Sequence, residues 1–265
     1  MNDIRTCLPG DHPWQNHIYR FEAVDSTNDR AKAMAAEGAP EGTCVISASQ
    51  TGGRGRLGRS FHSPANQGLY LSLVLRPNCP PQELMHLTCA AAVAACDAVE
   101  HTAHIRPRIK WTNDLVSGGK KLGGILTELS LNAQTGLVSY AVVGIGINCT
   151  QAPEDFPPEL QSTAASLSMV SGNAPSPEAL AAALLCSLHN MNSRLLTKKA
   201  ALMAAYRQDC MTVGKQVVLL RGDEKRRGTA LDVTEDGALT VQFEDGTVEN
   251  VSSGEISVRG MYGYV

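Results

Sequence analysis

The alternation of hydrophobic and polar positions predicts a chain that mixes strands and helices. Between residues 69 and 75 every second position is leucine, which is the period of a strand with one buried face. Residues 82–100 are rich in alanine with the apolar spacing of a buried helix. Shorter apolar runs at 19–24, 43–49 and 105–111 predict further strands.

The second half of the chain continues the mixture. Residues 121–131 and 137–148 read as two strands, and the segment between them favours a tight reversal. Residues 177–196 and 198–211 read as two helices, the first opened by Ser176 and the proline after it. The expected fold class is therefore α/β (α+β), with a mixed β-sheet and packed helices.

After Gly214 the pattern changes to short β-rich runs, at 216–220, 228–233, 238–243, 248–251 and 255–258. Asp-Gly pairs at 236–237 and 245–246 predict hairpins between them. These runs favour a small SH3-like β-barrel. We therefore expect three parts: a leader at 1–18 that packs loosely or not at all, a large domain at 19–212 and a small domain at 213–265.

Composition and charge narrow the class of protein. The 265 residues carry a formal net charge of -3, which argues against a surface built as a whole for nucleic acid. The eight cysteines form no C-x-x-C pair and lie mostly in apolar runs, as reduced, packed thiols do. The N-terminus lacks the apolar core of a secretion signal, and no apolar stretch approaches the ~20 residues that span a bilayer. We expect a cytoplasmic protein that does not enter a membrane.

Two segments carry candidate chemistry in the first quarter of the chain. Asp25-Ser26-Thr27-Asn28 precedes a predicted helix at 27–37, where side chains and free backbone N–H groups can bind an anion or a polar head group. Simple helix capping would use the same residue types. Gln50 precedes a loop at 52–59 with four glycines and three arginines, suited to phosphate or carboxylate. A solvated loop or an RGG-like nucleic-acid segment would also fit this composition.

Two further segments lie on predicted strands. Lys110, Asn113 and Asp114 lie at the end of the strand candidate at 105–111, and strand ends commonly line sites in α/β sheets. Lys110 could instead only cover Trp111 with its aliphatic stem. Glycines interrupt the strand candidates at 121–131 and 137–148, which marks close approach by a ligand or else a bulge.

Taken in order, the four segments resemble the signatures of the biotin protein ligase family. They match D-S-T-N, Q-x-x-G-R-G-R-x-G-R, K-W-P-N-D-L and G-I-G-I-N, and the tail 254–259 is similar to the family's C-terminal domain. The resemblance implies a class II synthetase-like catalytic domain that binds biotin and ATP, with Mg²⁺. It implies formation of biotinyl-5'-AMP and transfer of biotin to a lysine of a biotin carboxyl carrier protein.

The resemblance also assigns residues. Lys110 and Arg56 would be catalytic. The biotin-binding set would be Ser26, Thr27, Asn28, Gln50, Arg54, Gly55, Arg56 and Lys110. The nucleotide-binding set would be Arg56, Arg59, Phe61, Asn113, Asn148 and Arg259. No metal ligand is assigned. Thr112 stands where the family has proline, and Phe61 where an adenine-stacking tryptophan is common; a phenylalanine still stacks, with less area.

Competing functions remain at this point. A lipoate-type ligase would adenylate a similar acid, although the glycine and arginine pattern favours biotin. A non-catalytic small-molecule or nucleic-acid-binding module would need no lysine at position 110.

Many relatives carry an N-terminal DNA-binding domain, and with about 20 residues before the first motif we expect no DNA-binding repressor function. A homodimer is possible, and the Gly/Arg loop is expected to be mobile until a ligand orders it.

Overall fold

The larger of two sheets carries the candidate motifs. The computed structural model describes residues 3–221, 224–252 and 255–258. Seven strands form this sheet in the order β1 (Ile18–Phe21), β2 (Cys44–Ser47), β3 (Gly68–Leu75), β7 (Val138–Asn148), β6 (Lys120–Leu131), β5 (Asp114–Ser117) and β4 (Arg108–Lys110). Strands β1 and β2 pair in parallel and all other neighbours are antiparallel, so the expected mixed sheet is confirmed.

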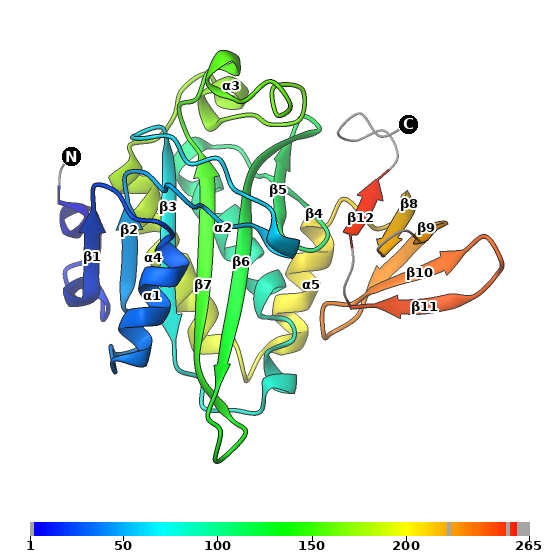
Figure 1. Cartoon of the computed structure of the whole chain (residues 1–265), viewed down its shortest axis with the longest axis horizontal. Helices are drawn as coiled ribbons and strands as arrows, with labels where there is room; N and C mark the ends of the chain where they lie inside the picture. Colours follow the sequence, from blue (N-terminus) through cyan, green and yellow to red (C-terminus); the bar gives the residue numbers. More distant parts are fainter. Residues whose placement is uncertain (1–2, 222–223, 253–254, 259–265) are drawn as a thin grey trace.

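Helices cover both faces of this sheet (Figure 1). Helix α1 (Thr27–Ala36) lies on one face, and α2 (Leu87–Ala103), α4 (Pro177–Arg194) and α5 (Lys199–Asp209) lie on the other. A short helix α3 (Leu167–Ser171) belongs to the long connection after β7. Short 3-10 turns lie before and between these elements, at Ile4–Cys7, Gln15–His17, Arg56–Gly58, Pro81–Leu84 and Pro153–Asp155.

The period-two pattern of the strands explains why there are two apolar layers. In β3, the leucines at 71, 73 and 75 join the large core under α2 and α4, while Val74 joins a smaller cluster under α1. Successive side chains of a strand point to opposite faces, so one strand supplies both layers. The alternating leucines therefore determined which face of β3 received the larger core.

The N-terminal segment differs from the expectation of a loosely packed leader. Ile4, Leu8 and Trp14 are buried in the main core, and Trp14 packs where Gly42 has no side chain. The prediction was wrong because these apolar residues follow no helix or strand period, and a 3-10 turn on α4 gives them their burial. Strand β5 and helix α3 were not predicted either.

A second, five-stranded antiparallel sheet follows the first. Its order is β11 (Val248–Val251), β10 (Leu239–Phe243), β9 (Glu224–Val233), β8 (Gln216–Arg221) and β12 (Glu255–Val258). The turn between β9 and β10 contacts the larger unit: the indole of Trp111 donates to the Gly237 carbonyl at 2.9 Å, and Lys199 is ion-paired with Asp236. Closure of this sheet into an SH3-like barrel stays a prediction.

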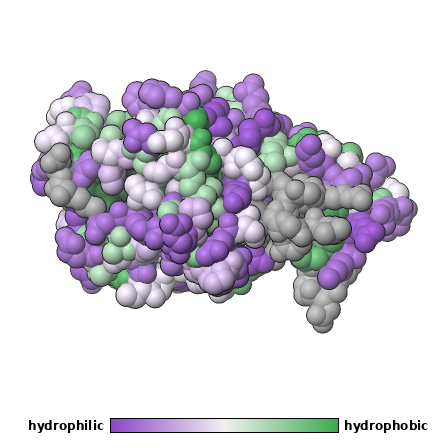
Figure 2. Space-filling model, turned by 90° about the horizontal axis from the view of Figure 1, so that it is seen from above, coloured by the Kyte–Doolittle hydropathy of each residue, from purple (hydrophilic) through white to green (hydrophobic). Residues whose placement is uncertain are grey.

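The surface is mainly hydrophilic in the view of Figure 2, and most of the cysteines are buried. Seen from above, hydrophilic residues cover most of the visible face, with hydrophobic residues in small scattered patches (Figure 2). All eight cysteines are free, and six of them are buried. Within the described part of the chain, no helix is both long and apolar enough to cross a membrane.

Candidate active site

Two adjoining cavities lie on the face of the sheet that α1 covers only in part. The first is lined by Ser26, Thr27, Asn28, Gln50, Arg54, Gly55, Arg56, Leu57, Arg59, Ser60, Phe61, Lys110, Trp111, Asn113, Asp114, Lys121, Gly124, Ile125, Leu126, Gly144, Ile145 and Gly146. The second is lined by Arg59, Ser60, Phe61, His62, Lys110, Asp114, Lys121, Asn148, Phe156, Glu159, Leu160, Ser162, Thr163 and Ala164. Six residues belong to both linings, so the cavities meet at a common junction.

Glycines of two neighbouring strands form the floor of the first cavity. Gly124 of β6 pairs with Gly146 of β7, and Leu126 of β6 pairs with Gly144 of β7. The three glycines lie at alternate positions and therefore face the same side of the sheet. A side chain there would collide with the site: a Cβ on Gly146 would lie 2.6 Å from the Phe61 ring. The missing side chains let Phe61 and Asn28, which line the cavity, pack directly on the strands.

The first turn of α1 forms a polar end of this cavity. The Thr27 backbone N–H and hydroxyl both donate to Gln50 Oε1, at 2.9 and 3.0 Å. The Gln50 amide nitrogen in turn donates to Ser63 Oγ at 2.9 Å, which fixes its orientation. Ser26 caps the helix, accepting from the Asp29 N–H at 3.4 Å. The capping interpretation is therefore confirmed for Ser26, and the same residue also lines the cavity.

Asn28 is the most fully constrained residue at the polar end. Its amide nitrogen donates to the Leu126 carbonyl at 3.3 Å and to Glu128 Oε2 at 2.9 Å. Its oxygen accepts from Ser72 Oγ at 2.6 Å, and it occupies the space above Gly144. All its hydrogen-bonding groups thus have protein partners, and a buried amide with these partners holds one orientation.

The predicted Gly/Arg loop is a compact hairpin above the first cavity. Gly55 N–H donates to the Arg59 carbonyl at 2.7 Å, and Phe61 N–H donates to the Gly53 carbonyl at 2.8 Å. Gly53 is packed so closely that a Cβ would lie 2.4 Å from the Phe61 carbonyl oxygen. At the tip, Leu57 adopts a positive φ of 57° and is exposed. We call residues 53–61 the Gly/Arg hairpin.

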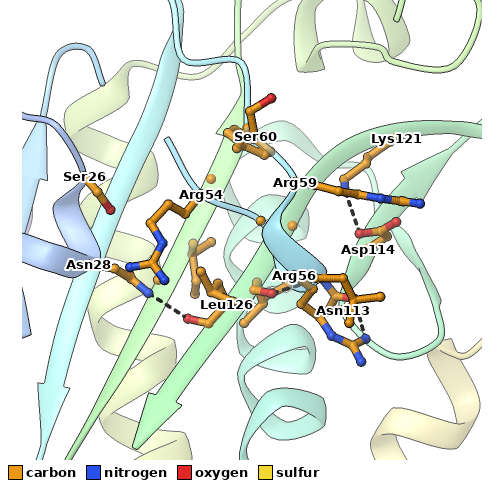
Figure 3. A pocket seen from close by; sticks show the side chains of 18 of the residues that line it. Ser26, Asn28, Arg54, Arg56, Arg59, Ser60, Asn113, Asp114, Lys121 and Leu126 are labelled. Atoms are coloured by element: carbon orange, nitrogen blue, oxygen red, sulfur yellow. Dashed lines mark hydrogen bonds and ion pairs between the residues drawn. The ribbon is translucent and has the colours of Figure 1, made fainter. Parts of the chain in front are cut away.

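The hairpin contacts both walls of the cavity. On one side Arg54 Nη1 donates to Asp29 Oδ1 at 2.6 Å, and on the other Arg56 Nη1 donates to Asn113 Oδ1 at 3.1 Å. Figure 3 shows Arg54 beside Asn28 and Arg56 beside Asn113, on opposite sides of the opening. The hairpin therefore bridges the mouth of the cavity.

Cationic side chains gather at the junction of the two cavities. Lys110, at the end of β4, is only 7% exposed and lines both cavities. Arg59 of the hairpin also lines both cavities, and Lys121 Nζ is ion-paired with Asp114 Oδ1 at 2.6 Å (Figure 3). An anion at this junction would lie among several positive charges in a partly buried site, where electrostatic attraction is stronger than in water.

The second cavity has aromatic walls and one buried amide. Phe61 packs edge-on against Tyr70, with 6.4 Å between ring centroids, and Phe156 lies in the wall formed by the connection after β7. Asn148 donates to the Ala165 carbonyl at 3.0 Å and accepts from Gln151 at 3.3 Å. A planar, polar ligand could bind in such a cavity.

Charged groups beside the polar end have shifted pKa values. Burial raises the pKa of Glu128, but hydrogen bonds from Lys32 and Asn28 and nearby positive charges outweigh it, so the pKa lies below its ordinary value. The pKa of Asp29 is likewise lowered, since its contacts with Lys32 and Arg54 outweigh burial. Both carboxylates are therefore ionised at neutral pH.

The structure brings together most of the residues that the sequence singled out. Of the candidate set, all except Asn148 and Arg259 line the first cavity, and Asn148 lines the second. Arg259 lies outside the described residues. The motifs did not identify Ser63, Ser72 and Glu128 as partners of the polar end, because each comes from a segment distant in sequence.

The donor set for a metal is sparse. Among the described residues no group of three or more His, Cys, Asp or Glu side chains could hold a metal ion. Asp114 and Glu159 are the carboxylates in the described linings of the two cavities. This arrangement fits a Mg²⁺ ion that binds mainly to phosphate oxygens and water, with one or two protein carboxylates nearby.

Comparison with known proteins identifies the family. Residues 20–148 match the Biotin/lipoate A/B protein ligase family, and residues 212–259 match the Biotin protein ligase C terminal domain. The bifunctional ligase/repressor BirA of Bacillus subtilis is 44% identical over 156 residues, which are 59% of this chain and 47% of that protein. The chain thus spans about half the length of the Bacillus relatives it matches.

Two other matches extend over most of both chains. The biotin--[acetyl-CoA-carboxylase] ligase of Mycobacterium tuberculosis is 34% identical over 237 residues, covering 87% of this chain and 85% of that protein. The structure of a biotin protein ligase from Aquifex aeolicus in complex with biotin and ATP superposes with a TM-score of 0.76 at 29% identity, covering 92% of this chain and 98% of that one. The chain therefore belongs to the biotin protein ligase family.

Proposed function

We propose that the protein is an ATP-dependent biotin protein ligase. It would activate biotin as biotinyl-5'-AMP and transfer the biotinyl group to a lysine of a biotin carboxyl carrier protein. The observation that carries this proposal is the position of Lys110, a buried ammonium that lines both cavities at their junction. A reaction between two anionic partners, one in each cavity, needs a fixed cation where they meet.

The shape and chemistry of the first cavity support biotin as the acid. Its polar end is lined by the hydroxyls and amides of the first turn of α1 and by Gln50, and these groups would face a ureido head group. Ile125, Leu126 and Ile145 line the cavity between that end and the junction and can contact an aliphatic chain. A carboxylate at the end of the chain would then lie beside Lys110.

The second cavity supports a nucleotide. Phe61 and Phe156 offer aromatic surfaces, and Asn148 offers an oriented amide. The α-phosphate would lie toward the junction, within reach of Arg56 and Arg59. Phe61 lines both cavities, which supports its assignment to nucleotide binding. Asn113 lines the first cavity, so its role at the nucleotide, like that of Arg259, stays a prediction.

The first step would join the two ligands. A biotin carboxylate oxygen attacks the α-phosphorus of ATP, the bond to the bridging oxygen breaks, and pyrophosphate leaves. Lys110 and Arg56 would offset the negative charge that builds up as the two anions approach, which lowers the barrier more than it stabilises the separate ligands. Mg²⁺ bound with the phosphates would neutralise pyrophosphate, and Asp114 and Glu159, which line the second cavity, would hold it.

The second step would release AMP. The neutral amine of the acceptor lysine attacks the acyl carbon, the bond to the phosphate oxygen breaks, and the amine gives up a proton as the amide forms. Between the two steps the mixed anhydride must be kept from water. The Gly/Arg hairpin bridges the mouth of the cavity and is placed to do so.

Pyrophosphate release is the experiment that tests this function. The full-length chain is incubated with ATP and Mg²⁺ and with biotin, lipoate or no acid. Release that depends on biotin supports the proposal, and release only with lipoate would indicate a lipoate-type ligase. No release with either acid, despite measurable biotin binding, would indicate a sensor. Transfer is then measured as biotin incorporated into a carrier domain and into a variant without the acceptor lysine.

A further inference from the structure

A network of four charged side chains lies beside the polar end of the first cavity. Arg54 Nη1 lies 2.6 Å from Asp29 Oδ1, and Arg54 Nη2 lies 3.4 Å from Glu128 Oε1. Lys32 Nζ lies 2.7 Å from Asp29 Oδ1 and 2.8 Å from Glu128 Oε1. Two carboxylates from different elements, α1 and β6, therefore hold one arginine of the hairpin.

Glu128 connects this network with the binding residues. Its Oε1 faces Lys32 and Arg54, and its Oε2 accepts from the Asn28 amide at 2.9 Å. The same carboxylate thus fixes Asn28 and contacts the hairpin. A carboxylate that accepts hydrogen bonds from fixed donors holds those donors in one geometry.

The hairpin transmits the position of Arg54 to its other residues. Arg54 and Ser60 form an antiparallel bridge, and the flanking hydrogen bonds of Gly55 and Phe61 close the ladder on both sides. Gly53 has no free space at its base. Because the backbone is internally bonded, holding Arg54 restrains the hairpin as a unit.

We propose that Asp29 and Glu128 are positioning residues that hold the Gly/Arg hairpin over the cavity through Arg54, while Glu128 also fixes the Asn28 carboxamide. We call the ion pairs of Arg54 with Asp29 and Glu128 the Arg54 latch. This inference gives Arg54 a second role beside contact with the ligand. It rests on the proposed function only for its effect on biotin, not for the latch itself.

The strength of the latch follows from its exposure. The side chains of Arg54, Asp29 and Glu128 are 45%, 36% and 23% exposed. Ion pairs in contact with water are individually weak and sensitive to salt. The latch therefore opens and closes readily, which suits a hairpin that must admit one ligand and shield an intermediate.

Hydrogen exchange of the ligand-free protein tests the latch independently of any activity. In the double variant Asp29→Asn with Glu128→Gln, exchange of amides in residues 53–61 should rise roughly fivefold, since two weak ion pairs are lost. Each single variant should give a smaller rise. Glu37→Gln removes the same charge from the exposed end of α1 and serves as the matched control, with exchange at the parent's rate.

A double-mutant cycle with Arg54 shows whether the carboxylates act through that arginine. Arg54→Met alone should raise exchange in the hairpin, and adding the two carboxylate substitutions should then change it little. Additive effects, or parent-like exchange in the double carboxylate variant, would overturn the latch. Melting temperatures of all variants establish that exchange reflects the hairpin and not global unfolding, and the single variants keep the test valid if the double variant is unstable.

Biotin kinetics provide the second readout. Asp29→Asn retains the Glu128 contact with Asn28 but weakens the latch, so biotin should associate and dissociate faster with little change in Kd. Glu128→Gln should in addition weaken binding, because Asn28 is less firmly held. Unchanged association and dissociation rates would contradict a role of the latch in ligand exchange. Absence of biotin binding in the parent would refute the proposed function while leaving the exchange result intact.

Discussion

The two ends of the first cavity are built on opposite principles. At the polar end, Thr27 donates two hydrogen bonds to Gln50, and the Asn28 carboxamide has partners at both its oxygen and its nitrogen. At the junction, Lys110, Arg59 and Lys121 bring positive charge to one space. At the first end, side chains fixed in one geometry would select the ligand. At the second end, positive charges would stabilise the negative charge of the transition state.

This comparison predicts different consequences of mutation. A change at the junction should affect the rate of the first chemical step more than binding. A change at the polar end should affect biotin affinity and the free energy of unfolding, because its hydrogen bonds join protein groups to one another in the folded chain. Each prediction below separates these two outcomes.

The largest effect is expected at Lys110. Lys110→Met keeps much of the apolar stem and removes the charge, so pyrophosphate release should fall by about a hundredfold to a thousandfold, corresponding to ~2.7–4 kcal/mol of barrier. Biotin binding should weaken but remain measurable, and the melting temperature should change little. Single-turnover adenylate formation is the measurement. A variant that releases pyrophosphate at the parent's rate would show that Lys110 only covers Trp111.

A large effect on binding is expected at Gly144. In Gly144→Ala the new Cβ would lie 2.0 Å from Asn28 Oδ1, so the carboxamide must leave its three partners. Biotin affinity should fall by roughly tenfold or more. The free energy of unfolding should fall by about 1–3 kcal/mol, as it does in overpacked cores. Calorimetric titration and denaturant unfolding measure the two effects. Gly10→Ala, where nothing lies within 4 Å, is the control, and parent-like affinity in the Gly144 variant would contradict a preorganised polar end.

A moderate effect is expected at Ser72. Its buried hydroxyl lies 2.6 Å from Asn28 Oδ1 and 2.8 Å from Thr27 Oγ1. Ser72→Ala leaves the Asn28 oxygen short of a donor, which should cost about 1–3 kcal/mol of unfolding free energy and lower biotin affinity. Ser193→Ala, an exposed serine on α4, should leave both unchanged. If Ser72→Ala altered the rate of adenylate formation but not biotin affinity, the result would contradict the prediction that the polar end determines binding and the junction determines the rate.

The smallest effect is a pH dependence of Glu128. Its pKa is lowered on folding from the ordinary value of 4.5, so the folded protein binds its proton less readily than the unfolded chain. The stabilisation is therefore fully present above that ordinary value and is lost as the pH falls through the lower folded pKa. The difference in melting temperature between the parent and Glu128→Gln should stay constant above the ordinary value of 4.5 and shrink as the pH falls below it. A difference that grew on acidification would contradict the assigned direction.

The sequence by itself determined the local elements and the identity of the motif residues. Alternating leucines predicted β3, a capping serine predicted the start of α1, and Asp-Gly pairs predicted the turns after β9 and β10. These features depend on neighbours within a few residues, so periodicity and capping preferences are sufficient to find them. The residues that the resemblance of four motifs to one family then assigned all line the two cavities, except Arg259, which lies outside the described residues.

Only the tertiary structure decided which distant residues complete the site. Strand register brings Gly124 beside Gly146, and Glu128 reaches Asn28 across 100 positions of sequence. Nothing in the local pattern of Ser63, Ser72 or Glu128 marks them as partners of the polar end. The N-terminal segment shows the same limit, because the burial of Trp14 depends on packing around Gly42 and α4. Side-chain periodicity reports which face of an element is buried, whereas pairing between elements depends on contacts that the local sequence does not contain.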